Sequence, residues 1–267
     1  MDVGTIAGSA ADDAQVRAAV GHVCEVLGDA VVGVLLHGSA VGAGLQRYSD
    51  LDLLVVVGRS TTGEERAQLL SSLLALSRPF TGPDGRPLEV TVVRQDLLRP
   101  WPDRPAHELL FGEWLRAEYE AGAVPDPEDD PDLAPLVATA FSGSLPLLGP
   151  AIEQLLDPPP RSALVAVMRR CVPSLLADLD TDTNVLLTLA RMVTTARDGR
   201  IVSNAAEAAT LEAEMPGHLV APLRAAREWY LGITPGTAGA PGERRATAEW
   251  LLAAFDAADR PPRHLVT

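Results

Sequence analysis

The stretch LLHGSAVGAGLQRYSDLDLLVVV, Leu35–Val57, decides the architecture of the N-terminal part of this chain. Its two ends are short apolar runs rich in leucine and valine, which predict two buried strands. Gly38 and Ser39 end the first strand. Asp50 and Asp52 stand at the mouth of the second strand, whose other members are leucine and valine. A strand that breaks its own apolar pattern is where function is expected.

The two aspartates are costly at this place. Residues two apart in a strand point to the same face, roughly 6.6 Å apart along it. Like charges beside an apolar core repel each other and lose hydration. A divalent cation offsets both effects, because Mg²⁺ binds carboxylate oxygens and keeps its other positions for water and phosphate oxygens. The plainer alternative is that Asp50 and Asp52 merely cap a turn.

The surroundings of the pair favour the metal. Ten residues separate Ser39 from Asp50, and glycine followed by serine allows backbone and hydroxyl groups to approach a phosphate. A third acid, Glu89, lies in the apolar segment LEVTVV, 88–93, which predicts a third strand. Three acids on adjacent strand ends, facing a Gly-Ser turn, are typical of phosphoryl transfer with one or two metal ions.

Hydrophobic periodicity divides the chain into two parts. The segment DPPPRS, 157–162, is the best linker, because three successive prolines cannot continue a helix. We expect an α/β domain over 1–158, a mixed sheet flanked by helices, and an all-helical bundle over 159–267. Strands are predicted at 31–37, 51–57 and 88–93. Helices are predicted near Ser39 and at 12–28, 62–78, 104–121, 132–143, 150–156, 161–179, 184–198, 203–215, 218–231 and 243–259.

The composition of the chain excludes some classes of binding partner. The 267 residues include 36 acidic and 22 basic side chains, a net charge of −14. Such an acidic chain is a poor binder of nucleic acid or an anionic membrane, and suits a small cationic partner. No apolar run reaches the ~18 residues of a membrane span, and no signal peptide is visible. We expect a cytoplasmic protein, and a monomer.

Gly-Ser-x10-Asp-x-Asp with a third strand-borne acid resembles the nucleotidyltransferase superfamily. The segments around it resemble the aminoglycoside 3″(9)-O-adenylyltransferases, which act on streptomycin and spectinomycin. The resemblance runs from about residue 31 to 255, includes AAREWYLG, and is most specific in FGEW and NVLLTLAR. It implies a nucleotidyltransferase that moves AMP from ATP to a hydroxyl of the antibiotic, releases pyrophosphate and gives antibiotic resistance.

The resemblance assigns the metal and the base. It implies that Asp50 and Asp52 hold Mg²⁺, one or two ions. Glu89 matches the base that takes the proton of the antibiotic hydroxyl, so it touches the substrate. A third metal ligand is the alternative for Glu89, and the two roles can coexist.

Both parts of the chain are implied to contact ATP. Arg191 matches an arginine that reaches the triphosphate, with a surface arginine as the alternative. Tyr230 matches a tyrosine near the nucleotide, with a core aromatic as the alternative. Asn204 stands where the family has a lysine, so either nearby Arg200 compensates or phosphate binding is weaker. The N-terminal phosphate contacts are Gly38, Ser39 and Ser49.

The antibiotic site is implied by Trp114 of FGEW, which matches a tryptophan that stacks on the drug. A helix-packing tryptophan is the alternative. Asp180 and Asp182 precede Asn184, which matches a polar position that contacts the substrate. Helix capping is the ordinary alternative for these acids, and Thr181 occupies a place where an acid is expected.

The choice of antibiotic is predicted from two absent side chains. Relatives that accept streptomycin have a tryptophan and an aspartate where this chain has Val172 and Ala177, with Asp178 one residue off. We therefore predict spectinomycin over streptomycin. Two alternatives are a nucleotidyltransferase acting on another hydroxylated metabolite, and a non-catalytic regulatory or antitoxin partner with this fold.

Overall fold

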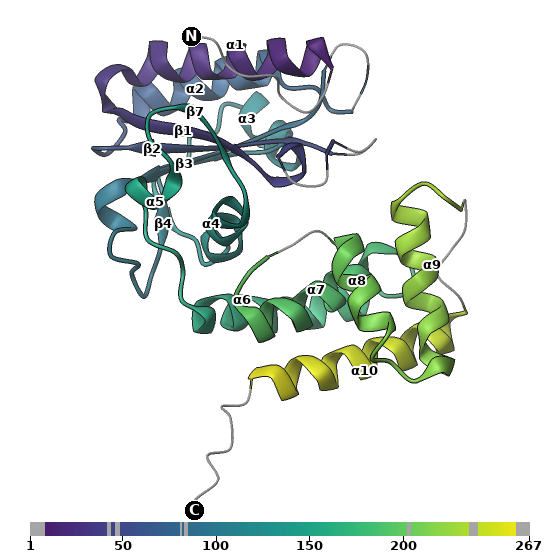
Figure 1. Cartoon of the computed structure of the whole chain (residues 1–267). Coiled ribbons are helices and arrows are strands. Elements are labelled where there is room, and N and C mark those ends of the chain that lie inside the picture. Colours follow the sequence, from purple (N-terminus) through teal and green to yellow (C-terminus); the bar gives the residue numbers. More distant parts are fainter. Residues whose placement is uncertain are drawn as a thin grey trace, which may run out of the picture. The chain divides into compact units, whose positions relative to one another are not determined.

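The computed structural model describes residues 9–41, 44–45, 49–80, 82, 85–201, 204–234 and 240–259, with the backbone alone at 204–206. Its chain divides into two compact units, Met1–Pro159 and Pro160–Thr267 (Figure 1). Each unit has its own hydrophobic core. The fold class is the predicted one, an α/β unit with a mixed sheet followed by a helical unit.

The N-terminal unit is built on a five-stranded sheet with the order β5-β3-β2-β1-β7. β1 and β2 are antiparallel, whereas β2 and β3 are parallel. β5 and β7 close the two edges in antiparallel pairs. The strands are β1 Val31–His37, β2 Leu51–Val57, β3 Leu88–Arg94, β5 Leu109–Phe111 and β7 Leu145–Leu148.

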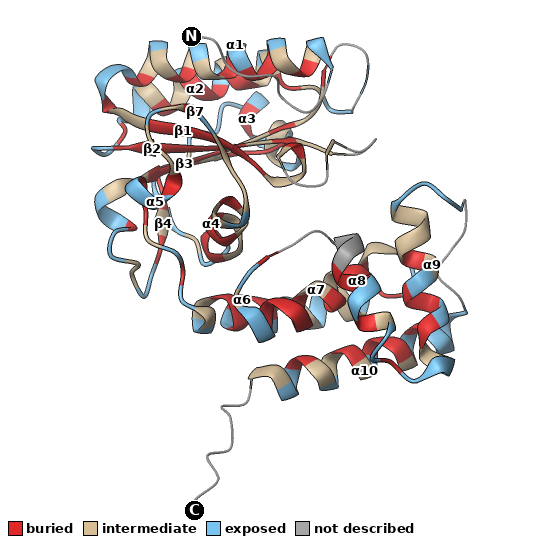
Figure 2. Ribbon diagram, viewed as in Figure 1, coloured by how far each residue is buried: buried red, intermediate tan, exposed pale blue. Residues whose placement is uncertain are grey.

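Both faces of this sheet are covered, which explains why its central strands are almost wholly apolar (Figure 2). Along β2, Leu53 and Val55 join one core cluster, and Leu54 and Val56 join the other, as strand alternation requires. The first cluster includes residues of α1 Ala10–Leu27 and α2 Gly63–Leu76. The second includes residues of α4 Leu133–Ser142 and α5 Ile152–Leu155.

The two helices on the first face begin with the same local signal. Ser9 accepts a hydrogen bond from the amide of Asp12, whose carboxylate returns to Ser9. Thr62 and Glu65 repeat this capping box at the start of α2. Each box satisfies amide groups that the first helical turn leaves unpaired.

The helix predicted over 104–121 is wrong. That segment contains β4 Ala106–His107, β5, a 3₁₀ turn η4 Glu113–Leu115, and only a short helix, α3 Arg116–Glu120. β5 pairs with β3, and β4 pairs with β6 Glu128–Asp129. Pairing with strands distant in sequence therefore overrides the local helical pattern.

Two smaller expectations also change. The helix expected near Ser39 is a single 3₁₀ turn, η2 Gly38–Ala40. The segment before Pro150 contains β7, which the sequence did not suggest, and β7 pairs with β1. Two more 3₁₀ turns are η1 Gly28–Ala30 and η3 Gln95–Leu97.

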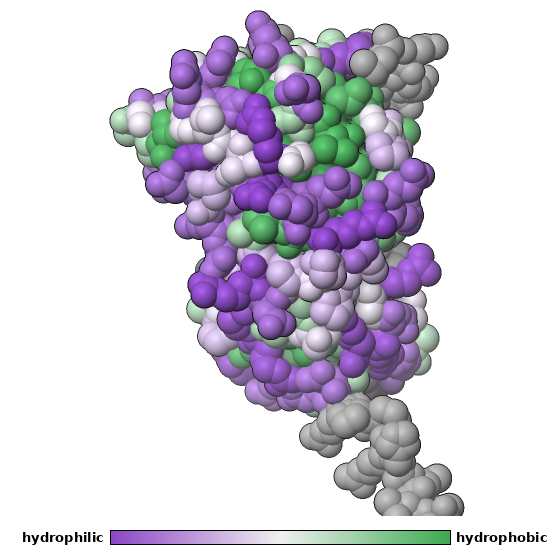
Figure 3. Space-filling view, turned by 90° about the vertical axis from the view of Figure 1, so that its left-hand side faces the viewer, coloured by the Kyte–Doolittle hydropathy of each residue, from purple (hydrophilic) through white to green (hydrophobic). Residues whose placement is uncertain are grey.

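The C-terminal unit is helical throughout its described elements. Its core joins apolar residues of all five helices around α7, among them Leu187 and Phe255. Among the described helices of the whole chain, none is both long enough and apolar enough for a membrane span. Figure 3 draws the whole chain, and on the face that it shows hydrophilic side chains cover most of the surface, whereas hydrophobic side chains gather in the upper part of the picture. The helices are α6 Arg161–Ala177, α7 Asn184–Asp198, α8 Asn204–Glu212, α9 Val220–Tyr230 and α10 Pro241–Asp259, with the 3₁₀ turn η5 Gly217–Leu219.

Gly149, which follows β7, tests the packing of this edge. Its φ is +77°, and a Cβ there would overlap the carbonyl oxygen of Val32 and lie 3.0 Å from the Cα of Gly33. Gly122 has a φ of +91° with open space around it. We expect Gly122→Ala to cost about 1 kcal/mol of unfolding free energy through backbone strain alone. Gly149→Ala should cost about 1–3 kcal/mol more through backbone collision. Equal losses in urea denaturation would show that β7 is not packed this way.

Candidate active site

Three ionisable residues lie in one row across the sheet. In the strand register His37 of β1 is opposite Asp52 of β2, and Asp52 is opposite Glu89 of β3. Strand alternation puts these side chains on the sheet face of Leu54 and Val56. The row therefore lies at the end of β1 and at the beginnings of β2 and β3, and the structure brings two of the predicted site residues together.

The carboxylates of this row are crowded. Burial, then the charges of Glu89 and Asp50, raises the pKa of Asp52 to about 7. Burial and then Asp50 raise the pKa of Glu89 to about 7. The pKa of Asp50 is raised by burial and then by Glu113, while Arg86 opposes the rise. The three acids thus act on one another electrostatically, as the sequence pattern indicated.

The other end of the row is an uncharged imidazole. His37 is buried, and burial lowers its pKa to about 4. It therefore carries no positive charge at neutral pH that could balance the acids. Its Nδ1 has no hydrogen-bond partner in the described part of the chain.

The Gly-Ser turn lies directly against Asp52. Gly38 has a φ of +69°, and a Cβ there would overlap the Oδ2 atom of Asp52. Glycine is required on both grounds, backbone conformation and space. Ser39 follows within the same turn and is half-buried. The predicted phosphate-binding turn and a predicted metal-binding carboxylate are therefore neighbours.

The donor atoms suit a hard cation. Carboxylate oxygens held close enough to raise one another's pKa are stabilised by Mg²⁺, which prefers such ligands. Among the residues described, no three His, Cys, Asp or Glu side chains form a complete metal site. Magnesium often uses one or two carboxylates and takes its other ligands from water and substrate phosphates. The arrangement fits an ion bound together with a nucleotide.

Arg86 is a site residue that the sequence analysis did not identify. Its Nη1 donates to the carbonyl oxygen of Ser49 at 3.0 Å, and its Nε donates to Asp12 Oδ1 of α1 at 2.9 Å. Gln15, also on α1, bonds to both the amide and the carbonyl of Arg86. The guanidinium thus ties the residue before Asp50 to the first helix. Its segment in the sequence, TGPDGRP at 81–87, predicts only a turn.

A second network holds the segment that follows β5. Arg116 donates from Nε to Glu113 Oε2 at 2.6 Å. Ser77 donates to the same carboxylate and accepts a bond from the amide of Leu88 at 3.0 Å. Leu88 begins β3 and precedes Glu89, so this network connects the FGEW segment to the start of that strand.

Trp114 lies in η4, and 59% of its surface is exposed. This exposure is opposite to what a tryptophan packed between helices would show. The residue before it, Glu113, is close enough to Asp50 to raise the pKa of that acid. The tryptophan therefore belongs to the same neighbourhood as the acids.

The helical unit contains the remaining candidates for nucleotide binding. Arg191 on α7 is half-buried, and burial lowers its pKa while Glu207 and Tyr230 oppose the change. Burial of this side chain, strong enough to lower its pKa, distinguishes it from a fully solvated surface arginine. Tyr230 ends α9 and packs against the helical core. Asn204 begins α8, and its side chain lies outside the described residues.

The acidic segment between α6 and α7 is exposed at Asp180 and Asp182. Asp182 Oδ1 accepts a hydrogen bond from the amide of Asn184 at 2.8 Å, a local contact of the kind that the capping alternative expects. The buried Arg244 of α10 donates to the carbonyls of Asp180 and Asp182, the latter at 2.9 Å. Arg244 therefore anchors the backbone of the segment that carries both exposed aspartates.

Comparison with known proteins decides the family. A spectinomycin 9-adenylyltransferase of Staphylococcus aureus is 38% identical over 210 residues, which are 78% of this chain and 81% of that protein. The chain belongs to the aminoglycoside adenylyltransferase family. It is therefore an enzyme of the nucleotidyltransferase class. Residues 154–256 match the family model described as aminoglycoside adenylyltransferase, C-terminal domain.

Two further comparisons agree. An aminoglycoside (3″)(9) adenylyltransferase of Klebsiella pneumoniae is 34% identical over 225 residues, 82% of this chain and 85% of that one. A crystal structure of a spectinomycin adenyltransferase from Enterococcus faecialis, with ATP and spectinomycin, has a TM-score of 0.78 at 26% identity. The matched region covers 91% of this enzyme and 99% of the chain in that crystal structure.

The crowding of Asp52 predicts a pH-dependent cost. Its pKa is about 7 in the folded enzyme and near 3.8 when unfolded, so the folded state loses stability as pH rises from about 4 to about 7. We expect Asp52→Asn to raise the unfolding free energy at pH 7.5, without nucleotide or divalent cation, by on the order of 1–2 kcal/mol. The gain should shrink at pH 5. Urea denaturation at both pH values measures it.

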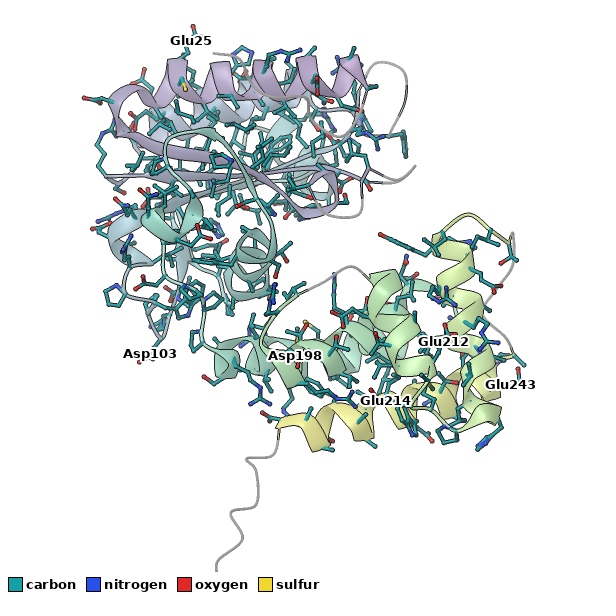
Figure 4. The ribbon with its side chains drawn as sticks, viewed as in Figure 1. Glu25, Asp103, Asp198, Glu212, Glu214 and Glu243 are labelled. Atoms are coloured by element: carbon teal, nitrogen blue, oxygen red, sulfur yellow. The ribbon has the colours of Figure 1, made fainter. Side chains whose placement is uncertain are left out.

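Asp103→Asn is the matched control, because Asp103 is exposed and points outward (Figure 4). It should leave stability unchanged at both pH values. A gain for Asp52→Asn that is the same at pH 5 and 7.5 would contradict charge crowding as its cause.

We expect substitution of Arg86 to lower turnover more than stability, provided that its buried partner Asp12 is replaced by a neutral residue at the same time. Removing Arg86 alone leaves the buried carboxylate of Asp12 without its ion-pair partner, which typically costs 3–5 kcal/mol. The double variant Asp12→Asn/Arg86→Met avoids this charge but still releases the Ser49 carbonyl. We expect a folded enzyme whose kcat/KM for the nucleotide falls about tenfold or more.

Arg66→Met/Asp126→Asn is the control, since it removes an ion pair of 2.6 Å elsewhere in the same unit. Steady-state kinetics with circular dichroism compare the two double variants. Equal kinetics in both would remove Arg86 from the site.

Proposed function

We propose that the enzyme transfers AMP from ATP to a hydroxyl group of spectinomycin, with Mg²⁺, and releases pyrophosphate. The observation that carries this proposal is the row in which Asp52 and Glu89 lie side by side against the Gly38 turn, with Asp50 close enough to raise the pKa of both. Such a reaction is mostly positioning and neutralisation of phosphate charge.

Asp50 and Asp52 would hold magnesium, which neutralises triphosphate charge when it is bound. Ser39, beside Gly38, is proposed to donate its hydroxyl to a phosphate, and Ser49 to do the same from the segment before Asp50. Arg191 is proposed to bind the triphosphate from the helical unit, because a half-buried guanidinium has lost part of its hydration and is stabilised by an anionic ligand. Tyr230 is assigned to the nucleotide on the family resemblance.

Glu89 is proposed as the general base. In the metal-free enzyme, burial and the charge of Asp50 raise the pKa of this carboxylate, which makes it a stronger base than an exposed glutamate. Its carboxylate would take the proton from the attacking hydroxyl as the oxygen bonds to the α-phosphorus and pyrophosphate leaves. Its position opposite Asp52 keeps it beside the nucleotide.

The antibiotic is proposed to bind through an aromatic face and acidic groups. Trp114 offers an exposed indole. Asp180 and Asp182 are exposed acids that suit a cationic amine, and Asn184 follows them at the start of α7. Spectinomycin is favoured over streptomycin because Val172 cannot supply the tryptophan platform of streptomycin-accepting relatives. Modification of the drug would make its host resistant, and dependence on ATP supports a cytoplasmic location.

A panel of hydroxylated compounds tests the proposed reaction. Purified enzyme with ATP and Mg²⁺ should release pyrophosphate with spectinomycin, weakly or not at all with streptomycin, and not with an uncharged cyclitol. Removing Mg²⁺ with EDTA should abolish release. Equal rates with both antibiotics would contradict the specificity, and release with none would overturn the reaction.

Glu89→Gln tests the base. We expect kcat to fall about 10²- to 10⁴-fold, the usual size of a general-base effect, while ATP binding measured by calorimetry is retained. Glu25→Gln is the control, because Glu25 points outward from α1 (Figure 4). Unchanged turnover in Glu89→Gln would exclude Glu89 as the base.

A further inference from the structure

Gly112 occupies the next position, after Glu89, in the row that crosses the sheet. In the antiparallel pair of β3 and β5, Val90 is opposite Phe111. One step further, the same register puts Glu89 opposite Gly112. The residue that leaves β5 therefore lies beside the proposed base.

The indole of Trp114 lies on this glycine. A Cβ built on Gly112 would be 2.6 Å from Cζ2 of Trp114, and Cη2 and Cζ3 of the same ring would be closer still. The backbone gives no reason for glycine, because φ is −157° and ψ is 156°, an extended conformation that any residue adopts. The space taken by the indole is the reason that the structure offers.

The chain on either side of the ring is held independently. Phe111 stacks on Tyr119 with ring centroids 6.0 Å apart and an interplanar angle of 20°. Glu113 is bonded to Arg116 and Ser77. The amide of Leu115 bonds to the carbonyl of Gly112 at 3.0 Å. With the backbone anchored in this way, the contact with Gly112 decides where the exposed ring lies.

We propose that Gly112 is a positioning residue for the antibiotic: its missing side chain leaves room for the Trp114 indole next to the position opposite Glu89, where the indole is a platform for the ring that bears the reacting hydroxyl. This inference rests on the proposed function and adds a residue to it. A side chain at position 112 would turn the indole away, while the acids and the Gly-Ser turn keep their places. The effect should fall on the antibiotic and spare ATP.

The first test is Gly112→Ala. We expect the KM for spectinomycin to rise roughly three- to tenfold, the worth of one aromatic stacking contact, with the KM for ATP unchanged. Acrylamide quenching of Trp114 emission, obtained as the difference from Trp114→Phe, should change in parallel. Gly21→Ala is the control, since a Cβ at Gly21 would meet nothing within 4 Å and should leave both KM values unchanged.

A double-variant cycle separates this inference from the proposed function. Trp114→Ala should raise the KM for spectinomycin, and Gly112→Ala should add nothing further in that background, because the collision is gone. An additive effect, or a normal KM in Gly112→Ala beside an impaired Trp114→Ala, overturns the role of Gly112 alone. A normal KM in Trp114→Ala overturns the platform itself. Failure of the proposed function is a different result, namely no AMP transfer by the unmodified enzyme.

Discussion

Repulsion between carboxylates held in register at the end of the sheet is the constraint on which the rest of the structure depends. Asp52 and Glu89 are paired positions of two parallel strands, and Asp50 is near enough to raise the pKa of both. A fold that keeps such groups together gives up stability to do so. A bound divalent cation would remove the penalty, which would link the cost in the free enzyme to the proposed chemistry.

Two hydrogen-bonded networks hold the acids where repulsion would separate them. Arg86 reaches from the segment before β3 to the Ser49 carbonyl and to α1, and its charge opposes the rise in the pKa of Asp50. Glu113 is held by Ser77 and Arg116 on the other side. Gly38 and Gly112 contribute because they have no side chain: Gly38 leaves room for Asp52, and Gly112 leaves room for Trp114. The site is thus supported by residues that need never touch the substrate.

The features of this enzyme that could be predicted are those that a short stretch of sequence determines by itself. The three central strands are visible as β-branched apolar runs, and Asp50 and Asp52 stand out because they interrupt one. β5 could not be found in this way, since three residues pair with β3 only after the sheet forms, and a local helical pattern competes with them. Arg86 was hidden for a related reason. Its partners on α1 are more than seventy residues away in sequence, and its own segment shows only turn residues.

The most direct test of the central claim is proton release when the site fills. Mg²⁺ and a non-transferable ATP analogue are titrated into the enzyme at pH 7 by calorimetry in two buffers with different ionisation enthalpies. Because Asp52 and Glu89 are partly protonated at this pH, binding should release a proton fraction approaching one, and Asp52→Asn should reduce it. Tight binding of the analogue with no proton released by the unmodified enzyme would contradict the account.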